Sequence, residues 1–153
     1  MAVQRGTARS TRPMLDELIE DLKFEEGWVD HPYRDSLGLL TIGYGFLIDE
    51  RRNIQMPKAV GELWLKIVAQ EKFNDLANRS PWILDLPEDV QRALGNMCYQ
   101  MGVDGVLRFR RMMNALGQGD RNLAAQEALN SKWAKQTPER AKRVTDLMRG
   151  SND

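Results

Sequence analysis

Glu26, Asp35 and Thr41 bring two carboxyl groups and a hydroxyl into one short segment of this chain. Glu26 ends a helical pattern, whereas Asp35 and Thr41 lie on either side of a predicted turn. Two carboxyl groups in unlike environments, one protonated and one ionised, are the usual means of cutting a glycosidic bond. The segment is therefore a candidate site for glycosidic bond cleavage.

Glu26 lies where the core-facing stripe of an amphipathic helix comes to its end. The apolar residues of that stripe are Leu15, Leu18, Ile19 and Leu22. Helical spacing carries the stripe on to Glu26, and Gly27 then offers a C-terminal stop. Desolvation and the helix dipole both favour the protonated form of a carboxyl group at such a position. Glu26 is thus a candidate general acid, and a solvated residue at a frayed helix end is the alternative.

Asp35 and Thr41 belong to a predicted β-hairpin, in which Asp35 is solvated and can hold or activate a water molecule. The pattern predicts strands over 33–35 and 39–48, with a turn between them. Along the second strand Thr41, Gly43 and Gly45 share one face, which leaves room for a bulky group against the backbone. Bulges or tight bends at the glycines are the alternative.

The order of these residues resembles the catalytic segment of the T-even phage lysozymes. Glu26, Asp35 and Thr41 are followed by Ile-Gly-Tyr-Gly, as in that family. The resemblance continues in Asn-Met-Cys-Tyr-Gln-Met-Gly at 96–102 and Ser-Lys-Trp-Ala-Lys-Gln-Thr-Pro-Glu-Arg-Ala-Lys-Arg-Val at 131–144. These separated segments occur in the family's order, and the resemblance covers most of residues 15–150.

The resemblance implies a lysozyme-like α+β fold, with a small antiparallel β-sheet lobe, a larger helical lobe and a cleft between them. It implies hydrolysis of the β-1,4 bond between N-acetylmuramic acid and N-acetylglucosamine in peptidoglycan. Glu26 is then the general acid, and Asp35 and Thr41 position the attacking water, with inversion at the anomeric carbon. No cofactor and no metal ion are expected.

Substrate-binding residues are implied by the same resemblance. Leu47 and Tyr99 match positions that line the saccharide groove, although apolar groove residues can equally belong to the core. Gln100 is a further candidate, and Gln136 matches a residue near the cleft. Arg140 matches an arginine that approaches the catalytic glutamate, where its positive charge opposes the effect of burial on that group.

Several positions depart from the family pattern. Leu37 stands where relatives often carry an acidic residue, and Phe46 stands where the pattern has histidine. Met112 and Glu127 occupy positions of polar groove residues. The segment 47–57 is shorter than in the T-even enzyme, which predicts a reduced sheet lobe and a more open cleft. These changes bear on affinity and substrate preference more than on the reaction type.

The remaining chain reads as one domain over 14–153 after a flexible tail, residues 1–13. A length of 153 residues with 42% hydrophobic residues suits a single compact core. The pattern predicts helices from Pro57, from Pro87 to Gly102, from Phe109 to Gly117, from Asp120, and from Thr137 to Gly150. The single cysteine, Cys98, lies on the apolar stripe of its helix and is expected to pack in the core.

Composition also limits partners and location. The tail has no apolar run like that of a secretory signal, and the net charge is zero, which makes long-range attraction to an anionic cell wall weak. We expect a monomer that acts on peptidoglycan, without nucleic acid or stable membrane insertion. The resemblance further implies a phage endolysin, which waits in the host cytoplasm until a holin opens the inner membrane and then acts in the periplasm. The alternatives are a lytic transglycosylase using Glu26 and a non-catalytic wall-binding or virion domain.

Overall fold

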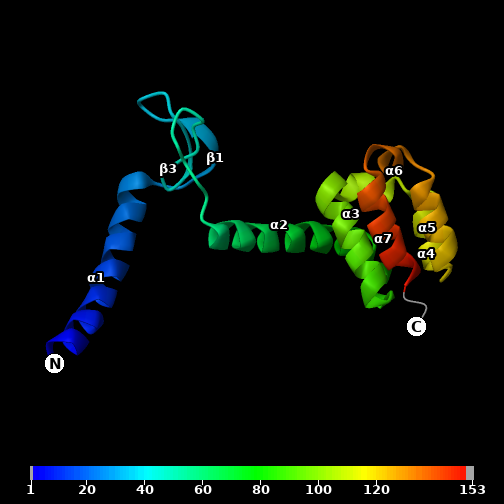
Figure 1. The fold of residues 1–153 in the computed structure, drawn as a ribbon, viewed down its shortest axis with the longest axis horizontal. Coiled ribbons are helices and arrows are strands. Elements are labelled where there is room, and N and C mark those ends of the chain that lie inside the picture. Colours follow the sequence, from blue (N-terminus) through cyan, green and yellow to red (C-terminus); the bar gives the residue numbers. More distant parts are fainter. Residues whose placement is uncertain (1, 151–153) are drawn as a thin grey trace. The chain divides into compact units, whose positions relative to one another are not determined.

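The structure, a computed structural model, describes residues 2–150, with side chains from residue 12 onward. The chain divides into two compact units, Met1–Met56 and Pro57–Asp153. Unit 1 runs from blue to cyan and unit 2 from green to red (Figure 1). Each unit is described by itself.

Unit 1 consists of one long helix and a small sheet. Its elements are α1 (Ala2–Glu26), β1 (Val29–Arg34), β2 (Leu40–Gly43) and β3 (Phe46–Leu47). The sheet is antiparallel with the order β1-β2-β3. Thr41 in the central strand lies opposite Tyr33 on one side and Leu47 on the other. Together with the helices of unit 2, this sheet confirms the predicted α+β class.

Helix α1 begins well before the position that the apolar pattern predicts. It starts at Ala2 and so includes most of residues 1–13. The flexibility of that segment, and the single domain over 14–153, stay predictions. The apolar stripe of α1 is exposed, because the sheet of unit 1 does not cover it. Its residues are Leu15, Leu18, Ile19 and Leu22.

The strand predicted over 39–48 is interrupted in the structure. β2 ends at Gly43, and a tight turn at Tyr44-Gly45 leads into β3. Gly43 and Gly45 adopt φ values of 71° and 69°. This left-handed conformation is incompatible with a continuous strand and is open mainly to glycine. The glycines therefore mark tight bends, which was the alternative interpretation of the pattern.

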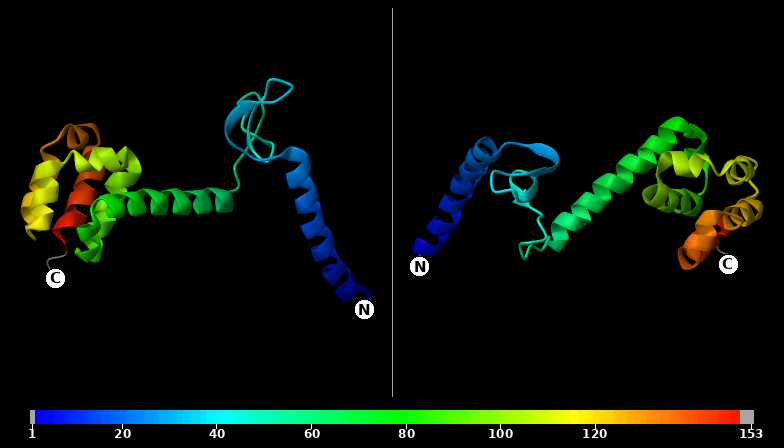
Figure 2. Two further views of the ribbon diagram at one scale, coloured as in Figure 1. Left: turned by 180° about the vertical axis from the view of Figure 1, so that it is seen from behind. Right: turned by 90° about the horizontal axis from the view of Figure 1, so that it is seen from above.

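Unit 2 is entirely helical in its described part. Its elements are α2 (Lys58–Arg79), the short 3-10 helix η1 (Pro81–Asp85), α3 (Glu88–Leu107), α4 (Arg110–Gly117), α5 (Arg121–Leu129), α6 (Lys132–Gln136) and α7 (Pro138–Arg149). α3 packs against α2 and α7, and α5 packs against α4 and α7 (Figure 2). No helix in the described part of the chain is long and apolar enough to cross a membrane.

The core of unit 2 forms around α3. Leu94, Met97 and Cys98 are fully buried there, which confirms the packing role predicted for the cysteine. Burial also raises the pKa of the Cys98 thiol. The predicted end of α3 at Gly102 is a kink, with φ of 79°, after which the helix continues to Leu107.

Helix α2 enters this core only at its last turns. Leu76 and Ala77 are buried. Its earlier apolar side chains are exposed, since the other helices of unit 2 contact mainly its C-terminal half. They are Val60, Leu63, Trp64 and Ile67.

Arg121, the first residue of α5, joins three helices of unit 2. Its Nη2 atom lies 2.6 Å from Asp89 Oδ2 near the start of α3. Its Nε atom donates to the carbonyl of Met148 in the last turn of α7. The hydrogen bond from Arg121 holds the pKa of Asp89 below its ordinary value of 3.8. This contact therefore stabilises unit 2 while Asp89 is ionised.

We expect Asp89→Asn to lower the free energy of unfolding by about 1–2 kcal/mol at pH 7, because a charge-assisted hydrogen bond is lost. Since the folded-state pKa is lowered, the stabilisation is complete above a pH of about 5 and is lost as the pH falls below the ordinary pKa. Urea unfolding at pH 7 and pH 3 measures both values. The exposed Asp85→Asn is the matched control, and an equal loss at both pH values contradicts the prediction.

Candidate active site

Glu26 is the last residue of α1. The φ of Gly27 is 68°, and its N–H donates to the carbonyl of Lys23, so the predicted C-terminal stop is confirmed. The prediction that Glu26 faces a core is wrong for unit 1, where the residue is exposed. Helical spacing correctly placed it on the apolar stripe, but that stripe is itself exposed within the unit.

The carboxyl group of Glu26 lies against the turn between β2 and β3. A Cβ atom built on Gly45 would collide with Glu26 Oε2 and would lie 2.9 Å from its Cδ atom. In the observed conformation, the Glu26 carboxyl group occupies the space that a side chain at position 45 would take. Gly45 therefore permits this close approach between the end of α1 and the β2–β3 turn.

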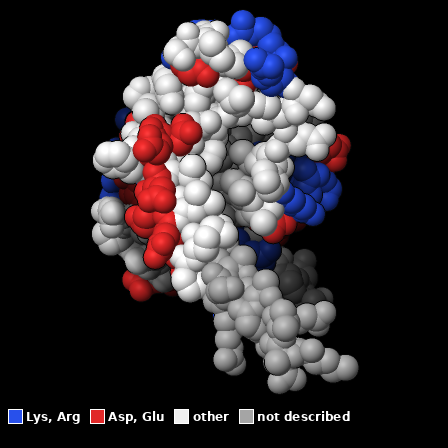
Figure 3. All heavy atoms as spheres, turned by 90° about the vertical axis from the view of Figure 1, so that its left-hand side faces the viewer, with Lys and Arg blue, Asp and Glu red and all other residues white. Residues whose placement is uncertain are grey.

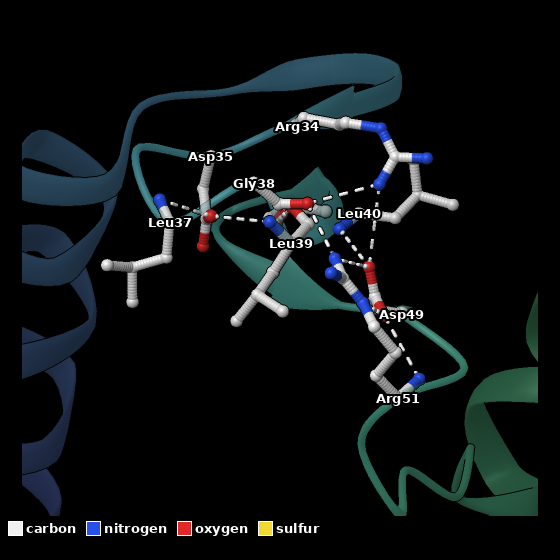
Figure 4. Close-up of polar contacts among 9 residues, drawn as sticks. Arg34, Asp35, Leu37, Gly38, Leu39, Leu40, Asp49 and Arg51 are labelled. Atoms are coloured by element: carbon white, nitrogen blue, oxygen red, sulfur yellow. Dashed lines mark hydrogen bonds and ion pairs between the residues drawn. The ribbon is translucent and has the colours of Figure 1, made fainter.

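Asp35 closes the turn between β1 and β2. Its Oδ1 atom accepts hydrogen bonds from the backbone N–H groups of Leu37 and Leu39, both at 2.9 Å (Figure 4). Its backbone carbonyl accepts from the N–H of Gly38. The side chain is half-buried rather than solvated as predicted, because it accepts bonds from its own turn. Its Oδ2 atom makes no hydrogen bond to the described residues.

Thr41 lies in the middle of β2 with only 2% of its surface exposed. Its hydroxyl donates to the carbonyl of Leu39 at 2.9 Å. The same carbonyl accepts the backbone N–H of Asp35 at 2.9 Å. One carbonyl thus connects the two residues, and the hydroxyl oxygen of Thr41 keeps its lone pairs for accepting a hydrogen bond from another group.

The space predicted beside Gly43 and Gly45 is filled by the protein's own side chains. A Cβ atom at Gly43 would lie 2.8 Å from the ring of Phe46 and 3.5 Å from that of Trp28. Tyr44 packs between these rings, with centroids 4.9 Å from Trp28 and 6.4 Å from Phe46. The predicted room for a bulky group is therefore occupied, by aromatic rings at Gly43 and by a carboxyl group at Gly45.

Two of the predicted binding residues are adjacent on α3. Gln100 accepts a hydrogen bond from the indole Nε1 of Trp133 at 2.9 Å. The Lys72 ammonium lies 5.2 Å from the centre of the Tyr99 ring and donates to the Tyr99 carbonyl. Gln100 is therefore held in a fixed orientation, whereas the partly exposed Tyr99 ring already has a cationic neighbour.

The other predicted binding residues belong to other elements. Gln136 is exposed at the end of α6. Arg140 is on α7, where its Nε donates to the side chain of Asn96 and its Nη2 donates to the Asn96 carbonyl. Leu47 is half-buried in β3 of unit 1. The structure thus brings Glu26, Asp35 and Thr41 into unit 1 and four of the five predicted binding residues into unit 2.

Unit 2 also contains an open groove of about 600 Å³. Met112, Glu127 and Trp133 line it, so two of the positions that depart from the family pattern do face a groove. Its rim is mostly basic, with Arg108, Arg110, Arg111 and Lys132. A net charge of zero is therefore compatible with local groups of like charge, such as the run of acidic side chains in Figure 3.

A small antiparallel sheet and a larger set of helices are typical of a lysozyme-type glycoside hydrolase. The sequence comparisons agree with this class. The phage lysozyme family model matches residues 23–151, and the chain belongs to this family.

Individual relatives match over much of the chain. "Probable T4-type lysozyme 2" of Dictyostelium discoideum is 28% identical over 160 residues, which cover 88% of this chain and 94% of that protein. "Probable T4-type lysozyme 1" of the same organism is 26% identical, with 88% and 95% covered. The pre-baseplate central spike protein Gp5 of Enterobacteria phage T4 is 35% identical over 106 residues, which cover 69% of this chain but 15% of that protein.

We expect Gly45→Ala to lower turnover on peptidoglycan about a hundredfold, because the added methyl group displaces the Glu26 carboxyl group. Steady-state rates on soluble glycan strands measure the effect. Gly119→Ala is the matched control: Gly119 also has a positive φ, of 80°, but nothing lies near its Cβ position. The prediction is contradicted if both variants lose the same activity, since strain rather than displacement would then be the cause.

Proposed function

We propose that this protein is a muramidase that hydrolyses the β-1,4 bond between N-acetylmuramic acid and N-acetylglucosamine in peptidoglycan. One observation carries the proposal. A single small unit presents Glu26 beside the β2–β3 turn, with Asp35 and Thr41 joined through one carbonyl. Membership of the phage lysozyme family supports the same substrate class.

Each residue has a role that follows from its contacts. Glu26 protonates the oxygen of the leaving sugar. The Oδ1 atom of Asp35 is engaged by its turn, so Oδ2 faces the substrate, where it stabilises positive charge on the sugar ring and orients the attacking water. The hydroxyl proton of Thr41 is committed to the Leu39 carbonyl, so its oxygen accepts a hydrogen bond from that water. Attack from the face opposite the leaving group inverts the anomeric carbon.

Substrate contacts in this proposal come from Leu47, Tyr99, Gln100, Gln136 and Arg140. The hydrogen bond from Trp133 leaves the amide nitrogen of Gln100 available as a donor to a sugar or amide oxygen. Arg140 and Gln136 supply further donors, while Tyr99 and Leu47 supply apolar surface.

The biological role that we propose is host cell lysis as a monomeric endolysin. The enzyme waits in the host cytoplasm and reaches the peptidoglycan when a holin opens the inner membrane. A place within a virion spike is the second candidate, since part of the chain matches a central spike protein. The likeness to two proteins named T4-type lysozymes favours the first candidate.

We expect mass spectrometry of the released muropeptides to find reducing ends and no anhydro ends. Anhydro ends would identify a lytic transglycosylase, which needs Glu26 but not Asp35. Glu26→Gln should lower the rate about 10²–10⁴-fold, because an amide cannot donate the proton. The adjacent Glu25→Gln is the matched control and should retain wild-type activity. Full activity of Glu26→Gln would refute the proposed mechanism.

Stereochemistry gives an independent measurement. We expect the first product formed from a soluble glycan to carry the α anomer at its new reducing end, because a water molecule attacks directly. Proton NMR of the anomeric signals in the first minutes distinguishes the anomers before mutarotation mixes them. A β anomer as the first product would indicate a retaining reaction instead.

A further inference from the structure

Asp49 is a buried carboxylate that follows β3, with 4% of its surface exposed. Its Oδ2 atom accepts the backbone N–H of Leu40 at 2.8 Å, at the start of β2 (Figure 4). Its Oδ1 atom accepts the Arg51 N–H at 3.0 Å and the Arg51 Nε at 2.7 Å. Arg51 Nη2 reaches Oδ2 at 2.8 Å, so the guanidinium engages both oxygens. These bonds, chiefly that from the Arg51 side chain, hold the pKa of Asp49 well below its usual range.

The same guanidinium also reaches the turn that carries Asp35. Arg51 Nη2 donates to the Gly38 carbonyl at 2.7 Å, and Arg34 Nη1 donates to that carbonyl at 3.1 Å. Gly38 in turn donates its N–H to the carbonyl of Asp35. Two arginines therefore donate to the Gly38 carbonyl in the Asp35 turn, and both also pair with Asp49, Arg51 through hydrogen bonds and Arg34 Nη1 at 3.7 Å from Oδ2.

These contacts act on both ends of the segment that joins Asp35 to Thr41. The bond from Leu40 to Asp49 fixes the residue just before Thr41, and the bond from Arg51 to Gly38 fixes the turn just after Asp35. The Leu39 carbonyl, which joins Asp35 and Thr41, lies between these two anchors. A change at Asp49 is therefore transmitted to both residues at once.

We propose that Asp49 and Arg51 are positioning residues, which set the geometry of Asp35 and Thr41 for the attack of water without touching the substrate. The inference rests on the proposed roles of Asp35 and Thr41. If Asp49 only stabilised the fold, its substitution would leave the turnover of the folded protein unchanged. Substitution of a positioning residue instead lowers kcat and leaves the affinity for substrate unchanged.

The test compares kcat and KM on soluble glycan strands for Asp49→Asn and Arg51→Lys, at a temperature where circular dichroism finds each variant folded. Asparagine places an NH₂ group against the guanidinium, and lysine lacks the planar fork that reaches Asp49 and Gly38 together. Each variant should lose about tenfold in kcat, with KM changed by less than about twofold. Arg51 is exposed, so its variant keeps the test available if Asp49→Asn does not fold.

Glu50→Gln and Arg52→Lys are the matched controls, because both side chains are exposed and make no ion pair with the described residues. The inference is overturned if folded Asp49→Asn or Arg51→Lys keeps the kcat of its control, or if the whole loss appears in KM. Asp35→Asn is measured in parallel. Full activity of Asp35→Asn would refute the proposed function, while an inactive Asp35→Asn beside a fully active Asp49→Asn would refute only the positioning role.

Discussion

The buried carboxylate of Asp49 is the constraint on which the sheet of unit 1 depends. β3 has two residues and β2 has four, so the strand ladders contribute few hydrogen bonds. A buried carboxylate is stable only when its oxygens are paired, and the partners of Asp49 are the N–H of Leu40 and the guanidinium of Arg51. The chain after β3 must therefore return to the start of β2, which closes a sheet that its strands alone would hold weakly.

A second constraint is the close approach of Glu26 to Gly45. Two features of Gly45 contribute to it. The Glu26 carboxyl group occupies the space that a side chain at Gly45 would take, and the turn has the left-handed φ that glycine adopts easily. One residue thus satisfies a requirement of the backbone and a requirement of the neighbouring side chain. Because these requirements differ physically, a substitution that relieves one still violates the other.

Local chemistry made much of the fold predictable. Asp120 accepts the Leu123 N–H as a helix cap, Pro138 begins α7, and Cys98 is buried, all as their positions in the sequence indicate. The break between β2 and β3 was not predicted, since strand-forming residues surround it. Periodicity placed Glu26 on an apolar stripe correctly, but it cannot tell what covers that stripe, and the residue is exposed within its unit.

Residue types and spacing made Glu26, Asp35 and Thr41 candidates, and the family resemblance supplied their roles and the binding residues. Asp49 and Arg51 gave no signal, because an acid-acid-base-base run after a strand is typical of a solvated segment. Their partners outside this pair include the backbone N–H of Leu40 and the carbonyl of Gly38. Since almost every residue has such backbone groups, these contacts leave no pattern in the sequence. The contacts around the Asp35 turn nevertheless join residues at most 13 positions apart. Interactions of such low contact order form early and rapidly, and the segment is synthesised before the helical unit. The nascent chain can therefore organise the segment from Asp35 to Thr41 before most of unit 2 has left the ribosome.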